Sequence, residues 1–380
     1  MSLRVAMFYH SLVSDWNHGN AHFLRGVAAE LQARGHRVKI YEPDGNWSTQ
    51  NLLRDHGKDA LQAFSKTFPN LKSTLYNSES LDIPEALDGV DLALVHEWNE
   101  PAVVARIGEL RRRNSRLRIF FHDTHHRAIT APDEMAKFAL GDYDGVLAYG
   151  ASLARAYETL GWGRRVHIWH EAADTRVFYP RERSSDSGDV VWIGNWGDEE
   201  RSEELREFLI EPVRRGGWKA RVHGVRYPGQ ALGALKSAGI EYRGWLPNFE
   251  APAVFAQFRA TVHVPRRPYV QQLAGIPTIR PFEALACGIP LVSAPWLDIE
   301  GLFRVGQDFL MARDGHQMQQ HLNDVLNDAG LARSLSENGL ETIWTRHTCG
   351  HRVAQLLKIF EAEKGDGERA ETSVLAEVRR

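Results

Sequence analysis

Cysteine is nearly absent from this chain of 380 residues, which has only Cys287 and Cys349. Two cysteines far apart, without metal-ligand spacing to histidine or cysteine, exclude a disulfide scaffold and argue against a zinc site. No apolar run approaches the length of a bilayer. The first residues are typical of a strand rather than a signal peptide, because the apolar run is short and no small-residue cleavage site follows. We therefore expect a soluble, cytoplasmic protein.

The chain also lacks an excess of charge of either sign. Lys and Arg number 46 and Asp and Glu 49, for a net charge of −3. This balance argues against general binding to nucleic acid or to an anionic membrane, so we expect no nucleic-acid partner and no integral membrane segment. An apolar content of 43% allows sizeable cores, and 380 residues suit two domains better than one.

Strand-like apolar runs alternate with amphipathic helical segments along most of the chain, which is typical of parallel α/β architecture. In the first half the predicted strands are Arg4–His10, Arg37–Glu42, Leu92–Trp98, Arg118–Thr124, Gly145–Tyr149 and Arg165–His170. The predicted helices there are Ala21–Arg34, Leu52–Ser65, Ala102–Arg113, Pro132–Leu140 and Ala151–Leu160.

The polar stretch Pro180–Gly188, PRERSSDSG, interrupts this pattern and indicates a linker or surface loop. The alternation then restarts, with strands predicted at Asp189–Gly194, Ala220–Val225, Glu241–Trp245, Ala260–Pro265, Pro290–Ser293 and Asp308–Met311. Helices are predicted at Glu203–Arg215, Gln230–Ala238 and Glu250–Phe258, around Glu283, and from Gly315 to about Glu363.

The most informative stretch is Gly275–Trp296, GIPTIRPFEALACGIPLVSAPW. Its short helix carries Glu283 and ends at Gly288, and a buried strand follows. Arg280 and Glu283 therefore lie near the start of a helix at the ligand-binding edge of a parallel sheet. The N-terminus of a helix favours anions, so this stretch predicts a site for a nucleotide diphosphate.

Polar residues after the first strand form a second candidate region. Asp15, His18, Gly19 and Asn20 precede a predicted helix. Glycine allows the backbone to approach a ligand, and Asp15 or His18 could act as a base toward an acceptor hydroxyl. Alternatively, Asn20 caps the helix and the histidines are solvated.

A dense titratable cluster, FFHDTHHR, follows another predicted strand. His122 and Asp123 can hydrogen-bond sugar hydroxyls, and we favour that role over metal binding because the spacing is not that of a helical ligand pair. His125 and His126 suit a structural role equally well. The nearby run Arg111–Arg118, RRRNSRLR, is interpreted as a solvated surface.

Further phosphate candidates follow the strands of the second half. Gly194 and Asn195 form a glycine-rich turn, with Arg201 after it, and Arg266 enters the loop that leads to Arg280. Backbone N–H groups and guanidinium groups both bind phosphate. Trp245 could stack on a base, although a core position explains it equally well.

Several motifs resemble those of GT-B glycosyltransferases, more narrowly a group-1-like branch related to spore-maturation enzymes. They are RGHRVKIYEP, the His18-Gly19-Asn20 loop, HEAADTRVFYP and RPFEALACGIPLVSAPW, and the likeness extends from Arg4 to about Phe360. The resemblance implies two Rossmann-like domains with a cleft between them and C-terminal helices. It also implies that Glu283 hydrogen-bonds ribose, that the loop before it holds diphosphate, and that His122 meets the donor sugar.

The chain departs from this family at one position. Many retaining members carry two glutamates eight positions apart, and Gly275 stands where the first would be. Contacts to the donor sugar or acceptor are then expected from Gly19, Asn20, Gly275 and Ile276, from backbone or side chain, and the stereochemistry does not carry over.

With the resemblance, the expected domains are residues 1–173 on the acceptor side and 189–348 for the nucleotide sugar, joined by an interdomain segment, 174–188. A C-terminal helix, 349–363, is expected to pack back on the first domain, before a disordered tail, 364–380.

The sequence thus predicts a metal-independent glycosyltransferase without a cofactor, since no Asp-x-Asp motif ends a strand. The donor is a nucleoside diphosphate sugar, with UDP favoured, and the acceptor is a hydroxyl. If the configuration inverts, Asp15, His18 and His122 are candidate bases. A nucleotide-sugar epimerase and a non-catalytic nucleotide-sugar-binding protein of the same fold remain alternatives.

Overall fold

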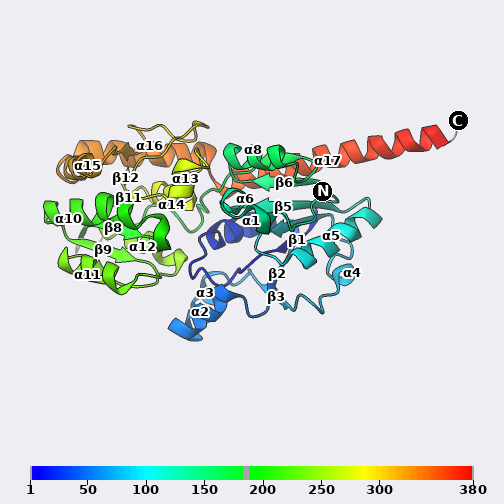
Figure 1. The fold of residues 1–380 in the computed structure, drawn as a ribbon, viewed down its shortest axis with the longest axis horizontal. Coiled ribbons are helices and arrows are strands. Elements are labelled where there is room, and N and C mark those ends of the chain that lie inside the picture. Colours follow the sequence, from blue (N-terminus) through cyan, green and yellow to red (C-terminus); the bar gives the residue numbers. More distant parts are fainter. Residues whose placement is uncertain (1, 183–187, 379–380) are drawn as a thin grey trace. The chain divides into compact units, whose positions relative to one another are not determined.

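The computed structural model describes residues 2–182 and 188–378, and side chains as far as residue 365. The chain divides into two compact units. The first unit comprises Met1–Ser14, Val27–His170 and Gly350–Arg380, and the second comprises Asp15–Gly26 and Glu171–Cys349. Each unit is built on one parallel β-sheet with helices against it (Figure 1). The expected α/β class is confirmed.

In the described part of the first unit, seven parallel strands are ordered β3-β2-β1-β4-β5-β6-β7. The strands are β1 Arg4–Phe8, β2 Arg37–Pro43, β3 Ser73–Tyr76, β4 Leu92–His96, β5 Arg118–Asp123, β6 Gly145–Ala148 and β7 Val166–Ile168. The helices are α1 Ala21–Ala33, which begins in the second unit, α2 Trp47–His56, α3 Asp59–Thr67, α4 Ile83–Ala86, α5 Pro101–Arg113, α6 Arg127–Thr130, α7 Pro132–Met135, α8 Ala151–Leu160 and α17 Cys349–Val378.

The central strands form because their residues are apolar on both faces. Every residue of β4 and β5 is buried, as expected of strands that helices cover on both sides. Helix α5 has Pro101 in its first turn and arginines in its last turn, both of which suit the ends of a helix.

The predicted helices and strands differ from the structure between β2 and β4, where the sequence pattern is weaker. The single helix predicted at Leu52–Ser65 is two helices, α2 and α3, because Gly57 adopts a φ of 67° that ends α2. The edge strand β3 was not predicted, since only Tyr76 of its four residues is buried. The helix expected at Pro132–Leu140 is only α7, which ends at Met135.

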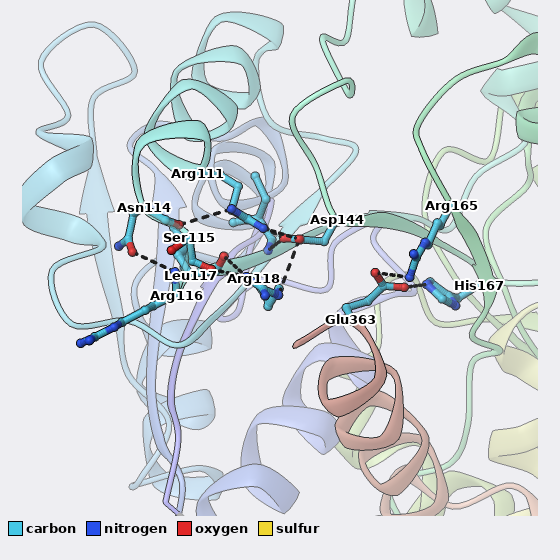
Figure 2. Close-up of polar contacts among 11 residues, drawn as sticks. Arg111, Asn114, Ser115, Arg116, Leu117, Arg118, Asp144, Arg165, His167 and Glu363 are labelled. Carbon is cyan, nitrogen blue, oxygen red and sulfur yellow. Dashed lines mark hydrogen bonds and ion pairs between the residues drawn. The ribbon is translucent and has the colours of Figure 1, made fainter. Parts of the chain in front are cut away.

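The arginine run between α5 and β5 is only partly a solvated surface. Arg111 donates to both carboxylate oxygens of Asp144, at 2.9 and 2.7 Å, and Arg118 is buried (Figure 2). Asp144 also accepts from the backbone N–H of Ile119. The prediction of a solvated run is therefore wrong for Arg111 and Arg118, because the partner carboxylate lies 33 residues away from Arg111 in the sequence.

The C-terminal helix α17 packs within the first unit. Its Glu363 lies 2.7 Å from Arg165 and 3.2 Å from His167 (Figure 2). The indole of Trp169 donates to the carbonyl of Arg352 at 2.9 Å. The helix continues to Val378, which differs from the disordered tail expected for residues 364–380. Charged residues such as Glu, Lys and Arg favour a solvated helix as readily as a coil.

In the second unit, the described residues form a sheet of six parallel strands in the order β10-β9-β8-β11-β12-β13. The strands are β8 Gly188–Ile193, β9 Ala220–His223, β10 Glu241–Tyr242, β11 Phe258–His263, β12 Leu291–Ser293 and β13 Leu310–Met311. The helices are η1 Asp198–Glu200, α9 Ser202–Leu205, η2 Arg206–Ile210, α10 Glu211–Gly216, α11 Gly229–Ser237, η3 Asn248–Glu250, α12 Ala251–Phe255, α13 Arg267–Gln271, α14 Ile279–Ala286, α15 Gly315–Asn327 and α16 Ala329–Arg346.

Alternate residues of these strands face a shared core. Val190, Trp192, Val222 and Val262 pack in one cluster with residues of the surrounding helices, such as Met318 of α15. The residues between them, such as Val191 and Thr261, face the other side of the sheet. Both sides are buried, so the sheet positions its loops rigidly at the carboxyl ends of the strands.

The boundary between the two units differs from the predicted one. Residues 15–26, which include the start of α1, belong to the second unit. Residues 183–187 of the predicted interdomain segment, 174–188, lie outside the described residues. Among the described residues, no helix combines the length and apolar character that crossing a membrane would require.

Gly26 shows how closely α1 packs within the second unit. A Cβ atom at Gly26 would lie 2.4 Å from the sulfur of Cys349 and 2.8 Å from Cβ of Asp174. We expect Gly26→Ala to lower the free energy of unfolding by roughly 1–3 kcal/mol, because overpacking outweighs the better helix propensity of alanine.

Gly233→Ala is the matched control for this substitution. Gly233 is exposed in α11 and has nothing within 4 Å of an added Cβ, so the same change should stabilise the protein by roughly 0.5–1 kcal/mol. Urea unfolding of both variants measures the difference. Equal effects would contradict close packing at Gly26.

Candidate functional site

The order of the strands in the second sheet reverses between β8 and β11. These two strands are neighbours in the sheet, although β9 and β10 lie between them in the sequence. Ligands of open α/β sheets bind beyond the carboxyl ends of the strands at such a switch point. Arg201 bridges it by donating to the carbonyl of Asn195, after β8, at 2.6 Å and to that of Val264, after β11, at 2.9 Å. Its side chain is thereby held at the switch point.

Arg201 carries its charge among other cations. It forms no ion pair with a carboxylate in the described part of the chain, and its hydrogen bonds go to backbone carbonyls. Burial lowers its pKa to about 9, and the positive charges of Arg266 and Arg280 lower it further while Tyr227 and Glu200 oppose this. The sequence predicted all three arginines as phosphate ligands, and the structure brings their charges close together.

The other two arginines each have one carboxylate partner. Arg266 lies 3.0 Å from Glu200, and Arg280 pairs with Glu283 one turn along α14. Helix α14 begins at Ile279, after Thr278, whose φ of 60° is unusual for a non-glycine residue. The N-terminal turn of α14 therefore carries Arg280 close to the guanidinium group of Arg201.

Glu283 is fully buried and accepts hydrogen bonds from three side chains. One carboxylate oxygen lies 2.9 Å from Nδ1 of His22 and 2.5 Å from Nδ2 of Asn248, and the other accepts from Arg280. Burial alone would raise the pKa of Glu283, but Arg280 and then His22 lower it below its usual value. An ionised carboxylate is thus buried beside Arg280.

The tautomer of His22 follows from its two contacts. Nε2 accepts the backbone N–H of Asp174 at 2.8 Å, so in a neutral ring Nδ1 carries the proton that is donated to Glu283. The ring also packs on Phe178, with centroids 4.2 Å apart. His22 joins the start of α1 to the segment around Asp174 and to α14.

Asp15 makes a second connection of the same kind. Its carboxylate accepts from Arg25 at 2.8 Å, from the indole N–H of Trp245 at 3.0 Å and from the backbone N–H of Asn248 at 3.1 Å. Three donors occupy the group that the sequence predicted as a base. Trp245, predicted to stack on a base, is half-buried and held by this contact.

His18, Gly19 and Asn20 lie at the start of α1. His18 is buried, and a Cβ at Gly19 would lie 3.4 Å from Ile279 of α14. Asn20 donates to Glu171 at 3.2 Å, while its Oδ1 has no partner among the described residues. Asn20 therefore does not cap α1 through its side chain, as one interpretation of the sequence suggested.

Glu171 is a buried carboxyl group that the sequence did not single out. Burial raises its pKa to about 8, with the hydrogen bond from Asn20 opposing and the charge of Glu283 adding to the rise. The group therefore holds a proton at neutral pH.

Gly194 and Asn195 follow β8 as predicted. Asn195 donates to Oδ1 of Asn17 at 2.6 Å and accepts the backbone N–H of Val225 at 2.9 Å. The side chain of Asn195 thus connects the ends of β8 and β9.

Gly275 and Ile276 lie close to the start of α14. Gly275 has a φ of 99°, and a Cβ there would lie 2.5 Å from a side-chain carbon of Ile299. Ile276 is 1% exposed. Only glycine suits this backbone, which gives a structural reason for the absence of the first glutamate.

The two remaining predicted residues, His122 and Asp123, belong to the first unit, where both are fully buried. Nδ1 of His122 lies 2.7 Å from the hydroxyl of Tyr9, and burial lowers its pKa to about 3. Asp123 accepts from the hydroxyl of Tyr157 at 2.7 Å and the backbone N–H of His125 at 2.9 Å. Burial raises the pKa of Asp123 to about 6, and these two hydrogen bonds oppose the rise.

The sequence placed His22 in the loop after the first strand, and His223 at a strand end where a base could stack or take backbone hydrogen bonds. It did not single out three further polar residues near these positions, Glu97, Glu171 and Asn248. Glu97 follows β4 beside Asp123, is fully buried and pairs with Arg127. Burial and the charge of Asp123 raise its pKa. A polar residue directly after an apolar strand was the available signal for Glu97, whereas nothing local marks Glu171 and Asn248. In the described residues, no group of three or more His, Cys, Asp or Glu side chains is arranged to hold a metal ion.

Comparison with known proteins identifies the domain and the fold. Residues 201–358 match the family model described as "Glycosyl transferase-like". No curated protein matches the sequence of the chain.

Solved structures with the same fold cover nearly the whole chain. An α-glucosyltransferase in complex with UDP and DNA is 12% identical, with a TM-score of 0.66 over 95% of this chain and 99% of its own. Sucrose-phosphate synthase from Thermosynechococcus elongatus is 14% identical, with a TM-score of 0.63 over 95% and 98%. The DNA-modifying β-glucosyltransferase is 12% identical, with a TM-score of 0.63 over 94% and 100%.

The chain therefore has the GT-B fold of these solved structures, and its residues 201–358 form a glycosyltransferase-like domain. The resemblance drawn from the sequence motifs is thereby confirmed. The expectation of no nucleic-acid partner is wrong, because proteins of the same fold include glucosyltransferases solved with DNA. A net charge averaged over the whole chain does not describe the local surface that meets an acceptor.

The raised pKa of Glu171 predicts a pH dependence of stability. The folded protein keeps a proton that the unfolded chain releases above its ordinary pKa of 4.5, so the free energy of unfolding should fall as pH rises from about 4.5 to 8. Glu171→Gln should remove up to about 1.4 kcal/mol per pH unit of this slope.

Urea unfolding between pH 5 and 8 measures the effect. Glu337→Gln, an exposed glutamate on α16, is the control and should leave the slope unchanged. The same slope in wild type and Glu171→Gln would show that Glu171 is ionised in the folded protein.

Proposed function

We propose that this protein transfers a sugar from a nucleoside diphosphate sugar to an acceptor hydroxyl without a metal ion or other cofactor. A UDP-sugar is the favoured donor. The observation that carries the proposal is the arrangement of Arg201, Arg266 and Arg280. Burial is the main cause of the lowered pKa of Arg201, and the positive charges of Arg266 and Arg280 add to it. A diphosphate would reverse the sign of this interaction, because each guanidinium would gain a charge-assisted hydrogen bond.

Transfer of the sugar requires positive charge next to the departing diphosphate. The acceptor oxygen forms a bond to the anomeric carbon of the sugar, and the bond from that carbon to the diphosphate oxygen breaks with its electron pair. The proton of the acceptor hydroxyl passes to the departing diphosphate or to water. The negative charge on the departing diphosphate grows in the transition state. Fixed arginines at a helix N-terminus stabilise that charge, which is the role that a divalent cation plays in other enzymes.

The proposal gives Glu283 and Asp15 positioning roles. Glu283 keeps Arg280 oriented, and the ribose contact implied by the family resemblance requires one of its three donors to move. Asp15 anchors Trp245 and Arg25 rather than acting as a base, because its oxygens already accept three hydrogen bonds. Contacts of Gly19, Asn20, Gly275 and Ile276 with the sugar or acceptor, and a cytoplasmic location, remain predictions.

Isothermal titration with UDP, GDP and ADP tests the donor site. Arg266→Gln should weaken binding of the preferred nucleotide by roughly tenfold, because one charge-assisted contact to phosphate is lost. Arg267→Gln is the matched control, since Arg267 pairs with Glu204 at 2.7 Å. Absence of binding to all three nucleotides would overturn the proposal.

Turnover assays test the reaction itself. A UDP-sugar incubated alone should stay unchanged, whereas an epimerase would convert it, and sugar should transfer once a suitable hydroxyl acceptor is present. Carbohydrate, small-molecule and hydroxymethylated DNA acceptors belong in the panel. Turnover should persist in EDTA, and loss of activity that Mn²⁺ restores would contradict metal independence.

A further inference from the structure

His223 is the last residue of β9, and its side chain is unusual among the buried polar groups of the second unit. It is 7% exposed, and neither ring nitrogen has a hydrogen-bond partner among the described residues. Buried polar atoms are nearly always paired, and an imidazole leaves both a donor and an acceptor unsatisfied here. A ligand could supply the hydrogen-bond partners that this side chain lacks.

The charge state of His223 is clear from its surroundings. Burial lowers its pKa to about 4, with Arg221 and Arg243 lowering it further and Glu241 opposing them. At neutral pH the ring is therefore uncharged. It offers one N–H donor and one bare nitrogen, which suits a nucleobase edge better than a phosphate.

The position of His223 relates it to the switch point. Its strand, β9, lies next to β8 on the side away from β11, so His223 is one strand removed from the strand end that Arg201 holds. Val222 points into the core below the sheet, and His223, one residue on, faces the opposite side.

Glycines on either side of His223 allow the neighbouring backbone segments to approach closely. Gly194 donates its N–H to the carbonyl of His223 at 2.8 Å, and Gly224 donates to the carbonyl of Gly244 at 2.8 Å. A Cβ at Gly224 would lie 2.0 Å from the carbonyl oxygen of Gly194. The backbones at the ends of β8, β9 and β10 thus approach one another at glycine positions, next to Trp245, which follows Gly244.

We propose that His223 hydrogen-bonds the nucleobase of the donor and thereby selects it, with uracil as the base. This inference rests on the proposed function, since it takes the diphosphate to lie at Arg201. Uracil can pair with one ring nitrogen of a neutral imidazole, through a carbonyl oxygen that accepts its N–H or through the N3–H group that donates to its bare nitrogen. His223 acts in recognition of the donor and not in the chemical step.

Titration with UDP and with inorganic pyrophosphate tests this role. His223→Phe fills a similar volume without hydrogen bonds and should weaken UDP binding roughly tenfold while pyrophosphate binding stays unchanged. Preference for UDP over CDP, GDP and ADP should shrink in the same variant. His223→Asn, which keeps a donor and an acceptor, should recover part of the UDP affinity.

The outcomes separate the two proposals. Wild-type affinity for UDP in His223→Phe overturns base recognition and leaves the donor site intact. Equal losses of affinity for UDP and for pyrophosphate also overturn base recognition, since they indicate a general disturbance of the fold. A lowered Tm of His223→Phe would reveal such a disturbance. His223→Asn would be expected to avoid it. A wild-type protein that binds neither ligand overturns the donor site and the role of His223 together.

A second histidine serves as the control variant. His321 lies on α15, whose Met318 and Leu322 pack on the core side of the sheet with Val222, opposite to the side of His223. His321→Phe should leave both UDP and pyrophosphate affinities unchanged.

Discussion

A buried carboxylate, that of Glu283, is the interaction on which the second unit depends most. It has no contact with solvent and accepts from His22, Asn248 and Arg280. Breaking a buried charge cluster by removing one partner leaves an uncompensated charge, so the three donors and the carboxylate stabilise one another. Through them the start of α1, the turn η3 and α14 are held in one arrangement.

The cationic switch point follows from this arrangement. Arg280 can lie near Arg201 only because Glu283 neutralises part of its charge and fixes its direction. Arg201 in turn depends on backbone carbonyls at the ends of β8 and β11. The strand ends thus carry three arginines, of which Arg266 and Arg280 each pair with one carboxylate.

Much of the fold and part of the candidate site could be predicted from the sequence. Apolar runs such as Arg118–Asp123 and Phe258–His263 are strands because burial on both faces imposes a local composition. Arg201, Arg266, Arg280 and Glu283 were recognised because each follows a strand or begins a helix. Glu171 was missed and the contact of His22 with Glu283 was not predicted, since the partners, Asn20 for Glu171 and Glu283 for His22, are more than a hundred residues away.

The sequence by itself determined the α/β class and the GT-B resemblance, and it predicted phosphate-binding arginines at the strand ends, because periodicity and residue type are local properties. Only the tertiary structure decided what individual polar groups do. It made Asp15 an anchor rather than a free carboxylate, gave Glu171 a raised pKa, and left His223 buried without a partner. It also explained Gly275, whose backbone angle and contact with Ile299 exclude a side chain. These outcomes depend on desolvation and on neighbours brought from distant parts of the chain, which no local pattern of residues encodes.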